Sequence, residues 1–407
     1  MVKVHPFSAL RFNSELPINS LIAPPYDVIP KEEREKYLGM HPYNITHLTL
    51  GDSLPVNYEE IKELFLKWIN SQVLITESPG FYLYKQEFQW GDRYEYNYGL
   101  IVLLELEPLG ENILPHEHTF SGPKLDRLEL LRKLRANLEP IWGIYEDKDS
   151  ILRSIWREVE KEKPIIKAHG WDYRIHTVWK LNKDNYVNLI ENFFLDKKVL
   201  IADGHHRYEA SWLYYEESKD TNAKYIMMLM TDLYDPGIKL LPTHRILKNN
   251  IGIEINAFRK YFDLYLEDNK IENLDLSFKP NNPYIYYAVD NKIFKLVPKA
   301  DYIKENKEHS ELWWILPTTI LHKGVWEGLL GKTENELQEK GVIRFSHDIK
   351  EVKSLLYSSD YKSAFVLPSI PIEIVYTLAV NRERLPQKST YFYPKPVSGL
   401  ILWRMNG

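Results

Sequence analysis

The chain has 407 residues, of which 44% are hydrophobic and 27% are charged, and its formal net charge is −5. These values are typical of a folded globular protein and exclude a disordered or fibrous chain and a nucleic-acid coat protein, which carries a basic excess. The sequence contains no cysteine, which excludes disulfides, thiolate metal ligands and thiol nucleophiles. The start shows no apolar signal-peptide core, and the apolar runs are too short to span a bilayer. We therefore expect a cytoplasmic protein that binds neither membrane nor nucleic acid, and its many Lys and Glu residues indicate a thermophile.

The N-terminal part of the sequence predicts helices that alternate with strands. Apolar residues at helical spacing predict a helix near residues 58–70, and aromatic and branched residues predict a β-hairpin over 80–107. Further along, Asp126 and Glu129 form a capping-box pattern, so we expect a helix with Asp126 as its N-cap.

The middle of the sequence alternates in the manner of an α/β layer. We predict a strand at "WDYRIHTVWKL", a helix at "DNYVNLIENFFL", a buried strand at "KVLIA", a helix at 205–217 and an edge strand at 238–247. This pattern predicts the α/β (α+β) class, with a mixed sheet and additional lobes.

A change of composition predicts two domains. Residues 249–310 are more polar than the rest and rich in Asn, Lys and Asp. We therefore place a catalytic α/β region at 1–248 and a C-terminal α+β lobe at 249–407. The end of that lobe, residues 384–399, is expected to return to the active site.

The stretch "VLIADGHHRYEASWLYY" is the main candidate for a functional site. A buried strand that ends at Asp203 and is followed by a helix directs backbone N–H groups and the positive end of the helix dipole to one point. Phosphate is a common ligand of such a turn. Arg207 can donate two parallel hydrogen bonds to two phosphate oxygens. The residues that would contact the phosphate are consecutive: Gly204, His205, His206 and Arg207. In such a site, Asp203 would either cap the helix or bind a metal. The alternative is that there is no anion site, that Asp203 is only an N-cap and that the histidines are polar surface residues.

Two segments offer candidate bases or metal ligands. In "PHEHT", His116 and His118 lie on one face of a strand and Glu117 on the other. If the segment is functional, either the two histidines bind one metal ion or Glu117 is a base. The alternative is a polar turn without a chemical role. In "PPYD", Asp27 is a candidate carboxylate held on a rigid proline corner, which ordinary turn chemistry also explains.

Two further segments offer anion donors. His244 and Arg245 in "PTHR" can add phosphate donors, and Lys388, Ser389 and Lys395 in "PQKSTYFYPK" suit an anionic substrate. A charged loop around packed aromatic residues is the alternative for the second segment. The sequence has no "GxxxxGK[ST]" loop and no "GxGxxG" turn, which argues against the common nucleotide-binding enzymes.

Several of these motifs occur together in one known family. "APPYDV", "LPHEHTFSGPKLDRLELLRKLRANLEPIW", "ADGHHRYEA", "LPTHRIL" and "LPQKSTYFYPKPVSGL" resemble, in order over nearly the whole chain, a widespread bacterial and archaeal family of unknown function. The Asp-Gly-His-His-Arg element is also similar to the phosphate-binding turn of the ParB/sulfiredoxin-like fold, which free-serine kinases use. The resemblance implies a ParB/sulfiredoxin-like core and a kinase that makes phosphoserine from inorganic pyrophosphate.

The resemblance also implies roles for the residues named above. The turn at 203–207 would hold the phosphoryl donor, with Mg²⁺ bound at Asp203 and bridging the phosphates. Glu117 or Asp27 would be the base near the serine hydroxyl, and Lys388 and Lys395 would close over the anion. His118 departs from the expected pattern and favours a metal at "HEHT".

The sequence thus predicts phosphoryl transfer to free L-serine, with pyrophosphate, ADP or ATP as donor and Mg²⁺ as cofactor. A metal-dependent phosphatase or hydrolase is one alternative, with ligands at Asp203 and at the histidines of the two motifs (His116, His118, His205 and His206). A ParB-like nucleotide-binding or DNA-binding protein without catalytic activity is the other. We expect Arg207→Ala to abolish turnover and to leave the fold intact, and we leave open whether the chain forms a homo-oligomer.

Overall fold

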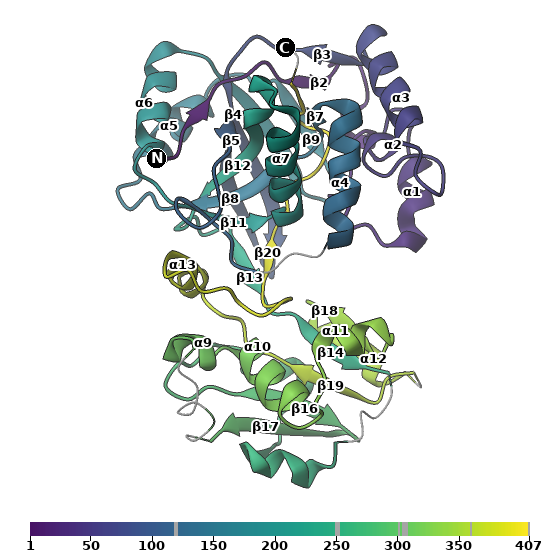
Figure 1. Ribbon diagram of the computed structural model, residues 1–407, viewed down its shortest axis with the longest axis vertical. Coiled ribbons are helices and arrows are strands. Elements are labelled where there is room, and N and C mark those ends of the chain that lie inside the picture. Colours follow the sequence, from purple (N-terminus) through teal and green to yellow (C-terminus); the bar gives the residue numbers. More distant parts are fainter. Residues whose placement is uncertain (118–120, 249–252, 300–301, 303–307, 359, 406–407) are drawn as a thin grey trace. The chain divides into compact units, whose positions relative to one another are not determined.

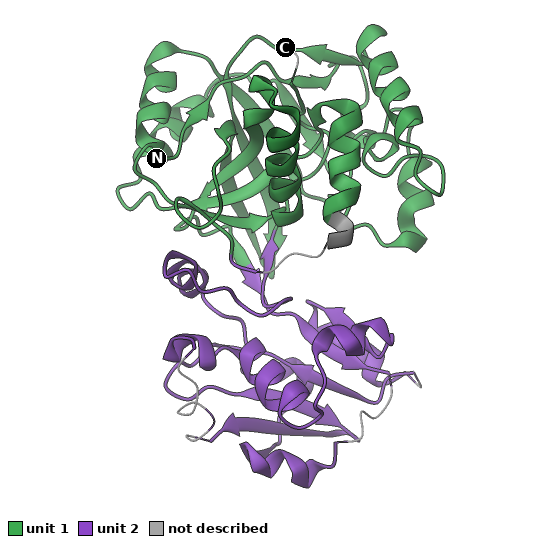
Figure 2. Ribbon diagram, viewed as in Figure 1, with its two compact units in different colours: residues 1–115, 119–239, 394–407 green, residues 116–118, 240–393 purple. Residues whose placement is uncertain are grey.

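The computed structural model describes residues 1–117, 121–248, 253–299, 302, 308–358 and 360–405, without the side chains of 121–123. The chain divides into two compact units, which Figure 2 shows in different colours. Unit 1 comprises residues 1–115, 119–239 and 394–407, and unit 2 comprises 116–118 and 240–393. The units change between Lys239 and Leu240, whereas the sequence analysis placed the junction between 248 and 249.

Unit 1 is built on a nine-stranded mixed sheet (Figure 1). The strand order is β6 (Ile113–Leu114), β11 (Val199–Asp203), β8 (Ile141–Tyr145), β12 (Tyr225–Asp232), β5 (Arg93–Glu105), β4 (Phe81–Trp90), β10 (Ile175–Leu181) and β9 (Ile166–His169), with β1 (Val4–His5) paired to β5. The pairs β11–β6 and β12–β8 are parallel, and the remaining pairs are antiparallel. The predicted α/β class with a mixed sheet is therefore confirmed.

The β4–β5 hairpin forms the long centre of this sheet. Apolar and aromatic residues fill most of the buried parts of both strands, and the register pairs Trp90 with Arg93 across a two-residue turn. Gly91 has a φ of +58°, which is the backbone that such a tight turn requires. Two short antiparallel pairs complete the strands of unit 1: β2 (Leu10–Phe12) with β3 (Leu74–Thr76), and β7 (Ala136–Asn137) with β21 (Trp403–Arg404).

The helices of unit 1 pack through apolar faces into two cores, one on the nine-stranded sheet and one that includes β2 and β3. The helices are α1 (Arg34–Leu38), α2 (Thr46–Thr49), α3 (Tyr58–Asn70), α4 (Ser121–Leu134), α5 (Ile151–Val159), α6 (Asp184–Phe194) and α7 (His205–Ser218), with 3-10 turns η1 (Ile18–Ser20), η2 (Lys31–Glu33) and η3 (Thr221–Lys224). In α3, the side chain of Asn57 caps the first turn, and Ile61, Phe65 and Trp68 form the buried face. Helices α4 and α7 lie side by side (Figure 1).

The predicted start of α4 is wrong. The helix begins at Ser121, so Asp126 lies inside it and is not its N-cap. The carboxylate of Asp126 instead accepts a hydrogen bond from the Tyr58 hydroxyl at 2.5 Å and pairs with Arg127. An acid three residues before a glutamate fits a capping box and an ordinary helix face equally well, and only the tertiary contacts separate the two.

Unit 2 contains a six-stranded antiparallel sheet. Its order is β15 (Phe262–Glu267), β17 (Lys292–Pro298), β16 (Ile285–Val289), β19 (Ser363–Val366), β14 (His244–Leu247) and β18 (Ile343–Ser346). The helical elements are α9 (Glu311–Trp314), α10 (Pro317–Thr319), the π-helix η6 (Ile320–Glu327), α11 (Glu334–Glu339), α12 (Ile349–Leu356) and α13 (Ile372–Val380), with 3-10 turns η4 (Ile255–Lys260) and η5 (Ile271–Asn273). Strands β13 (Lys239–Leu241) and β20 (Tyr391–Tyr393) form a separate pair.

Strand β14 corrects one prediction. Residues 238–247 were expected to form an edge strand, but β14 lies between β19 and β18, and all four of its residues are buried. Its partners come from far along the chain, so the local sequence does not show whether the strand is central. Among the helices that the structure describes, none combines the length and the apolar character needed to cross a membrane.

Three carboxylates meet where β12 ends, and they make the stability of the protein depend on pH. Asp232 accepts hydrogen bonds from the amides of Asp147 (3.0 Å) and Tyr234 (3.3 Å). Burial, reinforced by the charges of Asp147 and Asp235, raises the pKa of Asp232 to about 6. The folded protein therefore holds this proton more tightly than the unfolded chain, and the contribution of Asp232 to stability is lost as the pH rises from about 4 to about 6.

We expect Asp232→Asn to have a higher free energy of unfolding than the wild type at pH 7.5, because the amide removes the buried charge. The difference should shrink steadily as the pH is lowered towards 4. Urea titrations at several pH values measure it, with the exposed Asp149→Asn as the control. A constant difference across this range would show that Asp232 does not titrate there.

Candidate functional site

The turn between β11 and α7 has the backbone geometry of an anion-binding loop. Strand β11 ends at Asp203, and Gly204 has a φ of +94° that an L-residue rarely adopts. A Cβ atom at Gly204 would lie 3.0 Å from the guanidinium of Arg207. Gly204 has no side chain that could cap α7, and the positive dipole end of this 14-residue helix lies at the turn.

His205 and His206 form the first turn of α7. His205 is 5% exposed, and His206 is half-buried. Neither residue is therefore the fully solvated surface histidine that the alternative interpretation assumed.

Arg207 is a buried counter-ion of neighbouring carboxylates rather than an exposed, bidentate phosphate ligand. Its Nη1 donates to the Pro140 carbonyl at 2.8 Å, its Nη2 donates to Asp203 Oδ2 at 2.9 Å, and Nη1 lies 3.6 Å from Glu139 Oε2. The side chain is 12% exposed. Burial opposes its charge, but the carboxylates of Glu139 and Asp203 outweigh burial and raise the pKa of Arg207. The arginine thus holds two acidic side chains in place behind the turn.

Lys395 brings the C-terminal segment to the same turn. Its Nζ lies 2.6 Å from Asp203 Oδ1 and 3.4 Å from Asp27 Oδ2. Desolvation would raise the pKa of Asp27, but the charges of Lys395 and Arg207 outweigh it and hold that pKa below the ordinary value. Asp27 is therefore ionised at neutral pH. Three predicted residues from distant parts of the sequence, Asp27, Asp203 and Lys395, meet here.

Sequence reasoning missed Glu139, Tyr26 and Arg127. Glu139 is 8% exposed, and its Oε1 accepts hydrogen bonds from the Tyr26 amide at 3.1 Å and the Ser398 hydroxyl at 2.5 Å. The guanidinium of Arg127 lies 3.9 Å from the centre of the Tyr26 ring. Burial raises the pKa of Tyr26 to about 12. Arg127 and Glu139 belong to the long motif that carried the family resemblance, which was the available signal.

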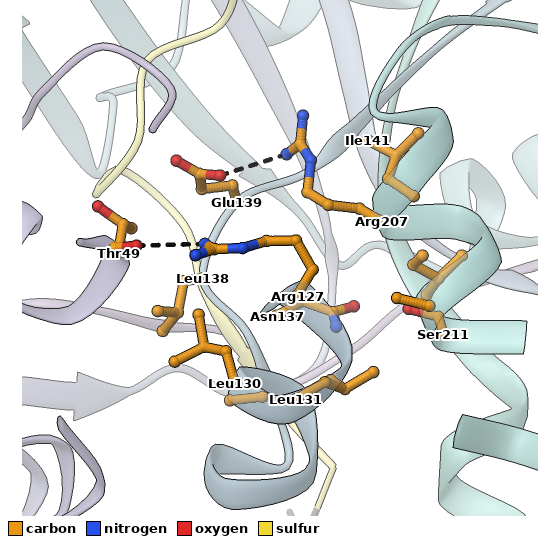
Figure 3. Close-up of a pocket in the computed structure, with 13 residues that line it drawn as sticks. Thr49, Arg127, Leu130, Leu131, Asn137, Leu138, Glu139, Ile141, Arg207 and Ser211 are labelled. Carbon is orange, nitrogen blue, oxygen red and sulfur yellow. Dashed lines mark hydrogen bonds and ion pairs between the residues drawn. The ribbon is translucent and has the colours of Figure 1, made fainter. Parts of the chain in front are cut away.

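A small cavity lies beside these side chains (Figure 3). Its volume is about 50 Å³, which suits a few water molecules or a small polar group. Aliphatic residues make up most of the wall, and Arg127, Glu139 and Arg207 supply the charges. The ion pair between Arg207 and Glu139 and the hydrogen bond from Arg127 to the Thr49 carbonyl are drawn as dashed lines in Figure 3.

We call the six charged residues the charged cluster: Asp27, Arg127, Glu139, Asp203, Arg207 and Lys395. Carboxylates and cations alternate in it, and the amides of α7 start at its edge. Such an arrangement can hold a polyanion through its cations and can orient a hydroxyl group through its carboxylates.

The residues present do not fit a magnesium ion held by the protein alone. Asp203 was the predicted ligand, but its Oδ1 is paired with Lys395 and its Oδ2 with Arg207. Across the described part of the chain, no three His, Asp or Glu side chains form a group that could hold a metal ion. His118, one of the ligands predicted for the hydrolase alternative, lies outside the described residues.

Arg245 and His244 belong to unit 2 and are corrections to the predicted phosphate donors. Arg245 is fully buried and binds Glu334 through two nitrogen atoms, at 2.8 and 3.0 Å, and also donates to the Thr243 carbonyl. His244 is 1% exposed and accepts the Leu367 amide at 3.2 Å. Burial lowers the pKa of His244 to about 3, so the ring is neutral. Both residues stabilise the interior of unit 2.

The other predicted residues of unit 2 differ in exposure. Ser389 is 7% exposed and donates its hydroxyl to the Pro386 carbonyl, so its predicted phosphate contact is not available in this geometry. Lys388 is exposed, with its Nζ 5.9 Å from the Phe345 ring centre. Glu117 is half-buried, and its neighbour His116 is bonded to the Thr390 hydroxyl at 2.8 Å.

A comparison with models of protein families shows to which family the chain belongs. The model of a protein family of unknown function, DUF1015, matches the chain over residues 4–319. The chain belongs to DUF1015. The family resemblance predicted from the motifs is thereby confirmed. A search of curated proteins found no match for this DUF1015 chain.

Three solved structures that the comparison matches are distant from this DUF1015 chain. A free serine kinase in complex with AMP is 13% identical, with a TM-score of 0.39, over 69% of this chain and 83% of the kinase. A conserved hypothetical protein from Pyrococcus furiosus is 13% identical, with a TM-score of 0.40, over 75% and 95% of the two chains. SbnI with a C-terminal truncation, from Staphylococcus aureus, is 10% identical, with a TM-score of 0.35, over 73% and 84%. Since each TM-score is below 0.5, function has to be inferred from the site itself.

Proposed function

We propose that the protein is a phosphotransferase that moves a phosphoryl group from pyrophosphate, ADP or ATP to the hydroxyl of free L-serine. The observation that carries the proposal is the meeting of Lys395, Asp203 and Asp27 at the start of α7. Helix amides and a lysine ammonium are standard ligands of phosphate oxygens. The choice of serine rests on the motif resemblance.

The charged cluster divides the work of transfer in this proposal. The amides of α7 and Lys395 bind the phosphates of the donor, and Arg207 keeps Asp203 and Glu139 in place. The serine hydroxyl oxygen attacks the terminal phosphorus, the bridging P–O bond breaks, and the hydroxyl proton passes to a carboxylate. Asp27 is ionised at neutral pH and is our first candidate for that carboxylate. Glu117, which belongs to unit 2, stays a prediction from the sequence. A weak base suffices because phosphoryl transfer depends mainly on positioning and charge.

The small cavity of Figure 3 is the proposed place for part of the acceptor. Its carboxylate and two guanidinium groups complement the ammonium and carboxylate groups of an amino acid. Pyrophosphate is our first candidate donor, because the motif resemblance implies it and because its phosphates need cations but no nucleobase pocket. Mg²⁺ enters the proposal as a companion of the donor phosphates, which can supply most of its ligands.

The experiment that tests the proposal is a product assay. The full chain is incubated with L-serine, Mg²⁺ and, in turn, pyrophosphate, ADP and ATP, and phosphoserine is measured by mass spectrometry. We expect phosphoserine with at least one donor, most rapidly with pyrophosphate. Release of phosphate without phosphoserine would instead show a hydrolase, and no turnover with any donor would contradict the proposal.

Chelation is the control for the role of the metal. EDTA is expected to stop phosphoserine formation and to leave the Tm of the substrate-free protein unchanged, because the metal arrives with the donor. A fall in Tm on addition of EDTA would reveal a metal held by the protein itself.

A further inference from the structure

The segment that carries Lys395 has no regular secondary structure, and buried side chains bind its carbonyl groups. Gln86 Nε2 donates to the Pro394 carbonyl at 3.3 Å, and Arg174 Nη1 donates to the Lys395 carbonyl at 2.8 Å. Further along, the amide of Ser398 bonds the Ala23 carbonyl at 2.9 Å. Side chains thus replace strand pairing at Pro394 and Lys395.

Arg174 and Gln86 are themselves fixed. Arg174 Nη1 also donates to Gln86 Oε1 at 3.1 Å, and Arg174 Nε pairs with Asp172. Gln86 is 1% exposed and Arg174 is 7% exposed. Gln86 lies within β4, and Arg174 directly precedes β10, the strand that pairs with β4. A fully bonded buried network of this kind is rigid, and loss of one member leaves others without partners.

We propose that Arg174 and Gln86 are positioning residues that hold the main chain of Lys395 so that its ammonium stays between Asp203 and Asp27. A lysine side chain is long and flexible, and its charge can be placed reproducibly only when its backbone is fixed. The network fixes that backbone, and the two carboxylates fix the ammonium. This inference rests on the proposed function, in which Lys395 binds the phosphoryl donor.

A double-mutant cycle in the full chain tests the inference, with the Kd of pyrophosphate measured by calorimetry. We expect Arg174→Met to weaken binding about tenfold in the wild-type background and to have no further effect when Lys395→Met is present. Arg11→Met is the matched control, because Arg11 also binds a carboxylate (Glu77) and a main-chain carbonyl (Phe12) in unit 1. That control should bind pyrophosphate as the wild type does.

The other outcomes separate the inference from the proposed function. If Arg174→Met weakens binding equally in both backgrounds, its role is structural and the inference is overturned. The same conclusion follows if Lys395→Met weakens binding and Arg174→Met does not. If Lys395→Met binds pyrophosphate normally, the proposed donor site itself is wrong, and the inference falls with it. Should Arg174→Met fail to fold, Gln86→Met takes its place in the cycle with the same expected results.

Discussion

Replacing Arg207 with methionine is expected to lower the free energy of unfolding by about 3–5 kcal/mol, because it leaves the buried carboxylate of Glu139 without its counter-ion and takes one of two cations from Asp203. Methionine keeps most of the side-chain volume, so the loss measures charge rather than packing. Glu139 is affected most, since it is 8% exposed and Arg207 is its ion-pair partner. Urea or guanidinium unfolding of the two proteins gives the difference directly.

Two further variants make this result specific. Arg207→Met combined with Glu139→Gln should recover part of the loss, because the amide carries no charge that needs a partner. The exposed Arg93→Met should stay within about 0.5 kcal/mol of the wild type. A single Arg207 variant as stable as the wild type would contradict the ion pairs described here. The sequence alone predicted that Arg207→Ala removes activity without changing the fold, and the burial of Arg207 replaces that expectation.

Lys395→Met is expected to reduce phosphoserine formation about 100-fold or more, because it removes the cation placed between Asp203 and Asp27. The fold should be retained, since Asp203 keeps its bond to Arg207 and Asp27 lies at the surface. Steady-state kcat/KM with the preferred donor is the measurement, and the Tm confirms folding. The result separates an anion-binding lysine from a structural one.

Lys180→Met is the matched control for this substitution. Lys180 is 11% exposed and pairs with Glu77 at 3.2 Å in unit 1, so it resembles Lys395 in burial and in having a carboxylate partner. Its loss should leave kcat/KM near the wild-type value. A Lys395→Met protein with activity within threefold of the wild type would remove Lys395 from the proposed site.

Local signals in the sequence identified the part of the site that depends on local structure. The turn at Asp203 and Gly204 could be predicted because an apolar strand, a glycine and a helix start follow one another within a few residues. The β4–β5 hairpin and helix α3 could be predicted for the same reason, since periodicity alone defines them. The mixed sheet followed from the alternation of such elements.

Partners that are distant in the sequence account for what could not be predicted. Arg245 has the composition of an anion donor in its motif, but Glu334, which neutralises it, lies 89 residues further along. Arg207 was predicted to bind phosphate oxygens because nothing near it in the sequence shows that Glu139 packs beside it. A charged residue reads the same in sequence whether its partner is a ligand or a buried side chain, and only the tertiary structure tells them apart.

The C-terminal segment has a practical consequence for anyone who divides this protein. Unit 1 is assembled from three separate stretches of sequence, and unit 2 is inserted before the last of them. A fragment that stops before Pro394 would lose Lys395, the Ser398 hydroxyl bonded to Glu139, and strand β21. Isolating unit 1 therefore requires the final stretch to be rejoined by a linker after Lys239, and a simple C-terminal deletion would remove residues that belong to this unit.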